Sequence, residues 1–184
     1  MFNGLESRGH EFVSLTELGI TQDCVEDGET FEENALKKAY FYAERSQLPT
    51  ITDDSGIIVD ALKDELGVRT RRWGAGERAN DEQWMDYFMK RMELESNRGA
   101  EFVCAAAYVD FHRFPKGTVF KGETRGELTL QLEAPIHAGI PLSSVFKPEG
   151  MDRVYSQLSF EEKARLSHRG KAFSQLLAFF ETIL

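Results

Sequence analysis

Hydrophobic residues recur at helical spacing in three segments of the chain, which predicts three amphipathic helices. These segments are residues 30–46, about 81–92 and about 168–184. Two capping boxes, in which a hydroxyl residue precedes a glutamate by three positions, begin at Thr30 and Ser159. The first box predicts the start of the first helix, and the second lies just before the last helix.

Apolar and β-branched runs predict strands at about 11–15, 49–51, 57–59 and 100–111. Residues 117–132 predict two further strands that meet near Gly126. We find no repeat, linker or low-complexity tract between these elements. The pattern therefore predicts one domain over residues 1–184, of the α/β class, with a long mixed central β-sheet flanked by helices.

The charge and composition of the chain exclude several classes of protein. The 184 residues are 41% hydrophobic, but no apolar stretch reaches the roughly 20 residues that a membrane helix needs. The first residues show no basic segment followed by an apolar run, so we expect a cytoplasmic protein without a membrane partner. A net charge of −9 argues against DNA or RNA as a partner. Neither the two cysteines nor the four histidines have the spacing of a zinc site.

The candidate chemistry centres on Asp53-Asp54-Ser55-Gly56, which separates two of the predicted strands and predicts an acidic turn at a strand end. Two adjacent carboxylates repel each other, and a divalent cation, a shared proton or exposure to water relieves that repulsion. The same residues are also ordinary turn formers. Taken alone, the segment leaves a metal site and a plain loop as alternatives.

A second candidate, Ser167-His168-Arg169-Gly170-Lys171, places three potentially cationic side chains at a helix start, where backbone N–H groups also favour anions. The alternative interpretation is a capped helix start whose charges face water. An acidic turn combined with a cationic helix start fits an enzyme that binds magnesium and a phosphate ester better than either feature does alone.

Three blocks of the sequence carry a resemblance to a known family. They are 30–39 (TFEENALKKA), 53–56 (DDSG) and 167–172 (SHRGKA), and in this order they resemble the inosine triphosphate pyrophosphatase family. The resemblance implies a mixed α/β fold with a long central sheet and usually a homodimer. It implies Mg²⁺-dependent attack of water at the α-phosphorus of a non-canonical purine nucleoside triphosphate, which releases the monophosphate and pyrophosphate.

The resemblance also implies roles for individual residues. Asp54 falls at the position of the proposed general base and magnesium ligand, and Glu26 at that of a second magnesium ligand. The residues at positions where the family binds substrate are Ser55, Lys163, His168, Arg169, Lys38 and Arg72.

The chain departs from the family pattern at two places that bear on substrate binding. The family opens with a strand and a Thr/Ser-x-Asn-x-x-Lys loop that holds the triphosphate, and this sequence begins after that point, so we expect a domain that is N-terminally incomplete relative to the family. The family's base-contacting Phe-Gly-Tyr-Asp-Pro segment aligns with 140–144, which leaves the preferred base open. Arg69 and Arg71 are candidate substitute cations, with solvated loop arginines as the alternative. The leading hypothesis is the pyrophosphatase, and the alternative is a non-catalytic nucleotide-binding or interaction domain.

Overall fold

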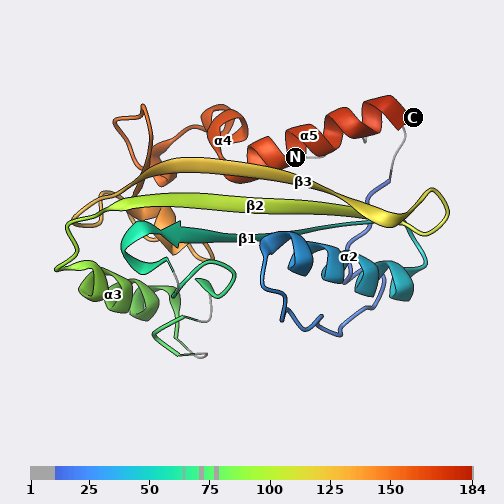
Figure 1. The fold of residues 1–184 in the computed structure, drawn as a ribbon, viewed down its shortest axis with the longest axis horizontal. Helices are drawn as coiled ribbons and strands as arrows, with labels where there is room; N and C mark the ends of the chain where they lie inside the picture. The colour runs from blue at the N-terminus through green and yellow to red at the C-terminus, as the bar shows by residue number, and fades with distance from the viewer. Residues whose placement is uncertain (1–10, 64, 71–72, 77–78, 184) are drawn as a thin grey trace.

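A long antiparallel β-sheet forms the centre of the chain (Figure 1). The computed structural model describes residues 11–63, 65–70, 73–76 and 79–183. The sheet has the order β1-β2-β3-β4. Its strands are β1 (Thr50–Val59), β2 (Gly99–Asp110), β3 (Phe114–Leu128) and β4 (Phe146–Pro148). The α/β class and the long sheet flanked by helices are confirmed. Among the described residues every pair of neighbouring strands is antiparallel, so the parallel pairing that a mixed sheet implies is not found there.

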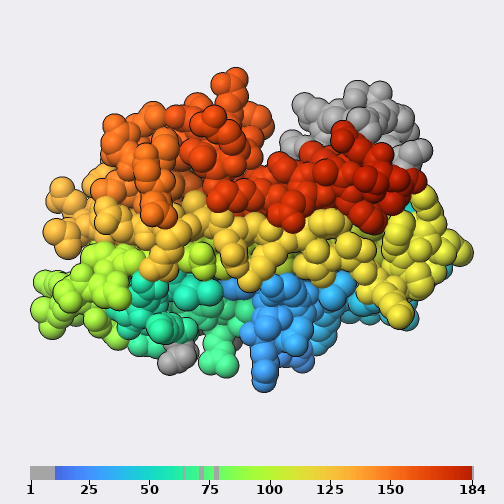
Figure 2. Space-filling model, turned by 45° about the horizontal axis from the view of Figure 1, so that its top comes forward, coloured from blue at the N-terminus to red at the C-terminus, as the bar shows by residue number. Residues whose placement is uncertain are grey.

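Helices cover both faces of the sheet. Their bounds are α2 (Phe31–Ser46), α3 (Asp81–Met92), α4 (Phe160–Leu166) and α5 (His168–Ile183). Figure 1 shows α2 and α3 on one side of the strands and α4 and α5 on the other, and in Figure 2 α5 lies over β3. These bounds confirm the three predicted helices, and the two predicted capping boxes are present at Thr30 and Ser159.

The alternation of side chains along β2 explains how two helices fit on one sheet. Val103, Ala105, Ala107 and Val109 pack against the alanines of α2 on one face. The residues between them face α5 and pack on Ala172, Phe173, Leu176 and Phe180. Small side chains let both helices approach closely. Residues 103–109 are all apolar because this part of the strand is buried on both faces.

A third cluster of buried side chains lies under α3, where Trp84, Phe88 and Met92 pack against the end of β1. Two short 3₁₀ helices, η3 (Pro141–Ser144) and η4 (Tyr155–Gln157), lie in the segment between β3 and α4. Among the described helices, none is both long and apolar enough to cross a bilayer.

The segment at 11–15 is not a strand, contrary to the prediction. The amide and hydroxyl of Ser14 both donate to the Glu17 carboxylate, at 2.7 Å each, and the Ile20 N–H donates to the Leu15 carbonyl at 2.9 Å. These local bonds form a turn in place of a ladder.

The predicted acidic turn is also absent. Residues 50–59 form one continuous strand, in which Asp53 and Asp54 lie opposite Ala106 and Ala105 of β2. The backbone groups of this segment pair with β2, and the side chains of the two aspartates find partners on opposite faces of the sheet. Long-range pairing therefore overrides the local preference of Asp-Ser-Gly for a turn.

Gly126 does not end a strand, as the sequence suggested, because β3 continues through it to Leu128. A side chain at this position would collide with the Lys147 carbonyl and the Phe146 ring. The glycine thus permits the close approach of β4, a role that the sequence pattern does not distinguish from a strand break.

Candidate functional site

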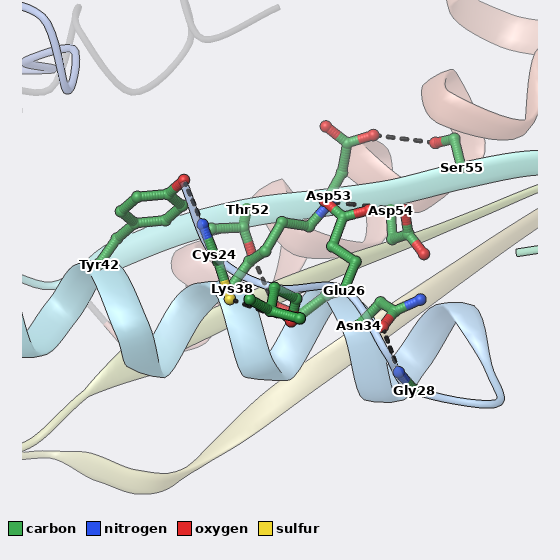
Figure 3. A network of polar contacts seen from close by, with 12 residues as sticks. Cys24, Glu26, Gly28, Asn34, Lys38, Tyr42, Thr52, Asp53, Asp54 and Ser55 are labelled. Atoms are coloured by element: carbon green, nitrogen blue, oxygen red, sulfur yellow. Dashed lines mark hydrogen bonds and ion pairs between the residues drawn. The ribbon is translucent and has the colours of Figure 1, made fainter. Parts of the chain in front are cut away.

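The two aspartates of β1 point in opposite directions, because successive side chains of a strand alternate between its faces. Figure 3 shows Asp54 on the side that faces α2, and Asp53 and Ser55 on the side that faces away from it. The candidate site therefore has two parts, a charged cluster under α2 and a pocket lined from both sides of the sheet, by α3 on one side and by α5 on the other.

The charged cluster consists of Glu26, Lys38 and Asp54 (Figure 3). The Lys38 ammonium lies 2.8 Å from a carboxylate oxygen of Glu26 and 3.4 Å from Oδ1 of Asp54. The side chains of Lys38 and Asp54 are only 15% and 10% exposed. The second carboxylate oxygen of Asp54, Oδ2, is buried and has no hydrogen-bond partner among the described residues. One ammonium thus joins two carboxylates that are far apart in the sequence.

The surroundings change the ionisation of this cluster. Burial raises the pKa of the Asp54 carboxyl above its ordinary value, and the charge of Lys38 opposes that rise. For Lys38, burial works against the charged form, but the hydrogen bond to Glu26 and the charge of Asp54 raise the pKa of the ammonium. The cluster therefore keeps a cation next to a carboxylate that binds protons more readily than a solvated one.

Helix α2 and the segment before it fix the positions of these groups. The Gly28 N–H donates to Oδ1 of Asn34 at 2.8 Å, which ties the segment that carries Glu26 to the first turn of α2. The Thr52 hydroxyl donates to the Ala35 carbonyl at 2.7 Å, which ties β1 to the same helix. A side chain at Gly28 would collide with Asn34, so the close approach depends on glycine.

On the opposite face of β1, Asp53 accepts hydrogen bonds from Ser55, Arg169 and, at 3.9 Å, the Cys104 thiol. The Ser55 hydroxyl donates to its Oδ2 at 2.9 Å, and Nε of Arg169, at the start of α5, lies 3.1 Å from the same oxygen. The ion pair is partly exposed, at 28% for the Asp53 side chain and 45% for that of Arg169. Asp53 therefore anchors the cationic start of α5 on the sheet.

A pocket of about 340 Å³ adjoins this ion pair. Its described lining residues come from six segments: β1 (Ser55, Gly56), the loop after it (Thr70), α3 (Trp84), β2 (Phe102), residues 139–143, and the region from η4 to α5 (Tyr155, Lys163, Ser167, His168, Arg169). This volume lies in the range of small-molecule sites. The segment that aligns with the family's base-contacting residues forms one wall.

His168 lies in this pocket as a neutral aromatic group, not as the cation that the sequence suggested. Its ring stacks on Phe102 with 4.8 Å between centroids and 14° between planes. Burial, and next the positive charge of Arg169, lower the pKa of His168 to about 3. The cationic charge of this helix start thus comes from Arg169 and Lys171.

The structure brings most of the predicted residues together in these two parts. Ser55, Lys163, His168 and Arg169 line the pocket, and Glu26, Lys38 and Asp54 form the cluster. Arg71 and Arg72 lie outside the described residues, and Arg69 is exposed. Sequence reasoning missed Trp84, Phe102 and Tyr155, because their apolar spacing is that of ordinary core residues.

The cluster under α2 offers two carboxylates to a metal ion. Within the described parts of the chain, no group of three or more His, Cys, Asp or Glu side chains is arranged to hold one. Mg²⁺ is commonly bound by one or two carboxylates together with water and substrate phosphates. Glu26 and Asp54, with its unpartnered buried Oδ2, fit that donor set.

Comparison with known proteins gives one consistent family. The Ham1 family model matches residues 2–179. A dITP/XTP pyrophosphatase of Streptomyces avermitilis is 37% identical over 179 residues, which is 95% of this chain and 86% of that protein. A dITP/XTP pyrophosphatase of Corynebacterium efficiens is 39% identical over 175 residues, which is 91% of this chain and 82% of that protein.

Solved structures agree with these sequence matches. The Staphylococcus aureus Ham1 protein superimposes with a TM-score of 0.86 at 31% identity, covering 100% of this chain and 94% of that chain. A HAM1 protein from Coxiella burnetii gives a TM-score of 0.83 at 30% identity, covering 94% of this chain and 86% of that chain. The family suggested by the three sequence blocks is confirmed.

Proposed function

Because the chain belongs to the Ham1 family, we propose that it is a Mg²⁺-dependent nucleoside triphosphate pyrophosphatase. It hydrolyses a non-canonical purine nucleotide to the monophosphate and pyrophosphate. Relatives named dITP/XTP pyrophosphatase support the substrate class. One observation carries the proposal: Asp54 of the Glu26–Lys38–Asp54 cluster is followed directly in β1 by Ser55 and Gly56, which line a pocket of small-molecule size.

In this proposal Asp54 is the general base. A water oxygen attacks the α-phosphorus, the bond from that phosphorus to the oxygen of the leaving pyrophosphate breaks, and the proton of the water passes to the Asp54 carboxylate. A carboxylate with a raised pKa suits this role, because it accepts a proton more readily than a solvated one. Oδ2 of Asp54 is buried without a hydrogen bond to another described group, and the nearby side chain of Asn34 lowers the pKa of the same carboxyl.

The remaining residues bind and orient the nucleotide. Lys38 keeps positive charge beside the reacting phosphate group, and Arg169 and Lys163 supply it at the pocket. Ser55 lines the pocket on the same face of β1 as Asp53, to which its hydroxyl donates a hydrogen bond. Neutral His168 and Phe102 offer an aromatic surface to the base.

Glu26 and Asp54 are the residues that would hold Mg²⁺. When bound, the ion supplies positive charge that neutralises phosphate oxygens and assists departure of pyrophosphate. These residues suit Mg²⁺ because the carboxylates of Glu26 and Asp54 both face one position where positive charge is stabilised. In the ligand-free chain the Lys38 ammonium lies between them.

A nucleotide panel tests the proposal. Pyrophosphate release is measured with ITP, XTP, dITP, ATP and GTP, each with Mg²⁺ and with an excess of chelator. We expect turnover of the inosine and xanthosine nucleotides that chelation abolishes. Saturable binding of the same nucleotides without pyrophosphate release would instead identify a non-catalytic nucleotide-binding domain.

A further inference from the structure

Asn34 carries a buried amide whose NH2 group makes no hydrogen bond of normal geometry within the described residues. The side chain belongs to α2 and the residue is 0% exposed. It lies one helical turn before Lys38, so the two side chains project from the same face of the helix, toward β1. Buried donors are normally paired, so this amide nitrogen requires a physical explanation.

The orientation of the amide is fixed by its oxygen. The Gly28 N–H donates to Oδ1 of Asn34 at 2.8 Å, and a backbone N–H can only donate. The amide oxygen therefore faces Gly28, and Nδ2 faces away from it. Figure 3 shows Nδ2 of Asn34 on the side of Asp54 and Oδ1 on the side of Gly28.

The group that Nδ2 faces is the carboxylate of Asp54. Burial raises the pKa of this carboxyl, and the Asn34 side chain acts in the opposite direction, which means that the amide stabilises the ionised form. Oδ1 of Asp54 lies 3.4 Å from the Lys38 ammonium, whereas Oδ2 is buried without a partner. A carboxylate oxygen has two lone pairs, so attraction to one amide leaves it able to accept a proton or a metal ion.

We propose that Asn34 is a positioning residue, whose amide N–H dipole fixes the orientation in which the Asp54 carboxylate meets Mg²⁺. The inference rests on the proposed function, which makes Asp54 a general base and a magnesium ligand. Because the amide is itself held by Gly28, it resists rotation of the carboxylate without adding a charge to the cluster. Residues that orient a metal ligand from behind typically change metal affinity or activity by about 10–100-fold when they are removed.

Binding of Mn²⁺ to the nucleotide-free chain tests this assignment. Mn²⁺ prefers the same oxygen ligands as Mg²⁺, and electron paramagnetic resonance measures its free concentration directly. We expect Asn34→Ala to weaken Mn²⁺ binding about tenfold. A dissociation constant equal to that of wild type would overturn the proposal, and so would a wild-type chain that binds no Mn²⁺.

Thr52→Val is the matched control for a general loosening of α2 on β1. It removes the bond of 2.7 Å from the Thr52 hydroxyl to the Ala35 carbonyl, which also joins α2 to β1, and leaves the Asn34 amide in place. The control should keep the wild-type dissociation constant for Mn²⁺. Weakening equal to that of Asn34→Ala would overturn the proposal, because it would show that any loss of contact between helix and strand has the same effect.

Asn34 also ties down the segment that carries Glu26, and Glu26→Gln separates the two roles. If the amide acts on Asp54, Asn34→Ala weakens Mn²⁺ binding by a similar factor in the Glu26→Gln background and in wild type. A loss that disappears in the Glu26→Gln background would overturn the proposal, because Asn34 would then act through Glu26.

A spectroscopic measurement on the wild-type chain needs no variant. The side-chain NH2 signals of Asn34 in the ¹⁵N-labelled protein should shift saturably with Mg²⁺, since the ion draws charge from the carboxylate that they face. Asn80 supplies the control signal, because its Oδ1 likewise accepts from a backbone N–H, that of Gln83 at 2.9 Å, at the start of α3. Asn34 signals that stay constant at magnesium saturation would overturn the proposal, even if Asn34→Ala does not fold or the Glu26→Gln chain binds Mn²⁺ too weakly to measure.

These measurements separate the proposal from the proposed function. A chain in which Asn34→Ala weakens Mn²⁺ binding as expected, but whose wild type releases no pyrophosphate from ITP, supports the positioning role and refutes the enzymatic one. A chain that releases pyrophosphate from ITP while Asn34→Ala keeps the wild-type affinity for Mn²⁺ refutes the positioning role alone.

Discussion

On the α2 face of β1, Asp54 is 10% exposed and lies beside Lys38, whereas on the α5 face Asp53 is 28% exposed and pairs with Arg169. The two residues are neighbours in the sequence, yet they share no partner in the described chain. Asp53 has both a hydroxyl and a guanidinium on its Oδ2, while Oδ2 of Asp54 has no partner. Saturated hydrogen bonding suits an anchor, and a buried oxygen without a partner suits a group that must accept a proton or a metal ion.

The largest difference between the two faces is expected in catalysis. Asp54→Asn should lower kcat/KM for pyrophosphate release by about 10³-fold, since it removes the proposed base without changing the size of the side chain. Asp53→Asn should lower it by less than about tenfold, because that residue only positions Arg169. Steady-state kinetics on both purified variants, with circular dichroism to check folding, measure the difference. Equal losses would mean that the two carboxylates act together.

The next largest difference is expected in stability. Lys38→Met leaves the buried Asp54 and the partly exposed Glu26 without their shared cation and should lower the free energy of unfolding by about 2 kcal/mol, somewhat less than for a fully buried pair. Arg169→Met breaks the more exposed pair on the other face and should cost less than about 1 kcal/mol. Urea denaturation of both variants gives the two values. If Arg169→Met lowers the free energy of unfolding more than Lys38→Met does, the α5 face of β1, and not the α2 face, carries the more stabilising ion pair.

The pH dependence of stability should also distinguish Asp54. Its folded pKa lies above the unfolded value, so between the two values the folded chain binds more protons, and the free energy of unfolding falls as pH rises through that window. Asp54→Asn does not titrate there and should gain stability over wild type from acidic to neutral pH. Denaturation midpoints of both proteins across that range test this, and a constant difference between them would contradict the raised pKa.

The smallest effects concern the hydroxyls on either side of β1. Thr52→Val removes the bond of 2.7 Å to the Ala35 carbonyl and should lower the free energy of unfolding by about 1 kcal/mol. Ser55→Ala removes the bond to the more exposed Asp53 and should lower it by about 0.5 kcal/mol. The same denaturation assay compares them. If Ser55→Ala proves the more costly, the α5 face contributes more to stability than its exposure suggests.

Local signals in the sequence predicted the helices well. The capping boxes at Thr30 and Ser159 satisfy backbone groups within a few residues, so they act whatever the rest of the chain does. The turn predicted at Asp53 and the break at Gly126 failed because the deciding contacts come from β2 and from β4. Strand pairing is a long-range property that composition alone does not determine.

The candidate site shows the same contrast between local signals, which the sequence reveals, and long-range contacts, which it does not. Residues within the family blocks, such as Ser55 and Arg169, line one pocket in the structure, and their roles in substrate binding stay predictions. Trp84 and Tyr155 carry no such signal, because an aromatic residue at helical spacing or in a loop looks like any core residue. The neutral state of His168 also depends on stacking partners from β2, which its own segment does not reveal.

Ile57, near the end of β1, forms an isolated antiparallel bridge with Gly67 of the following loop. This bridge has a consequence for solubility. β1 is an edge strand of the sheet described here, and its end is apolar, a combination that invites strands of other chains to add to it and aggregate. The Gly67 N–H donates to the Ile57 carbonyl at 3.0 Å, and the Ile57 N–H donates to the Thr70 hydroxyl at 3.1 Å. Both outward backbone groups of Ile57 are therefore occupied, and the loop that contributes Thr70 to the pocket also covers the apolar end of this edge strand.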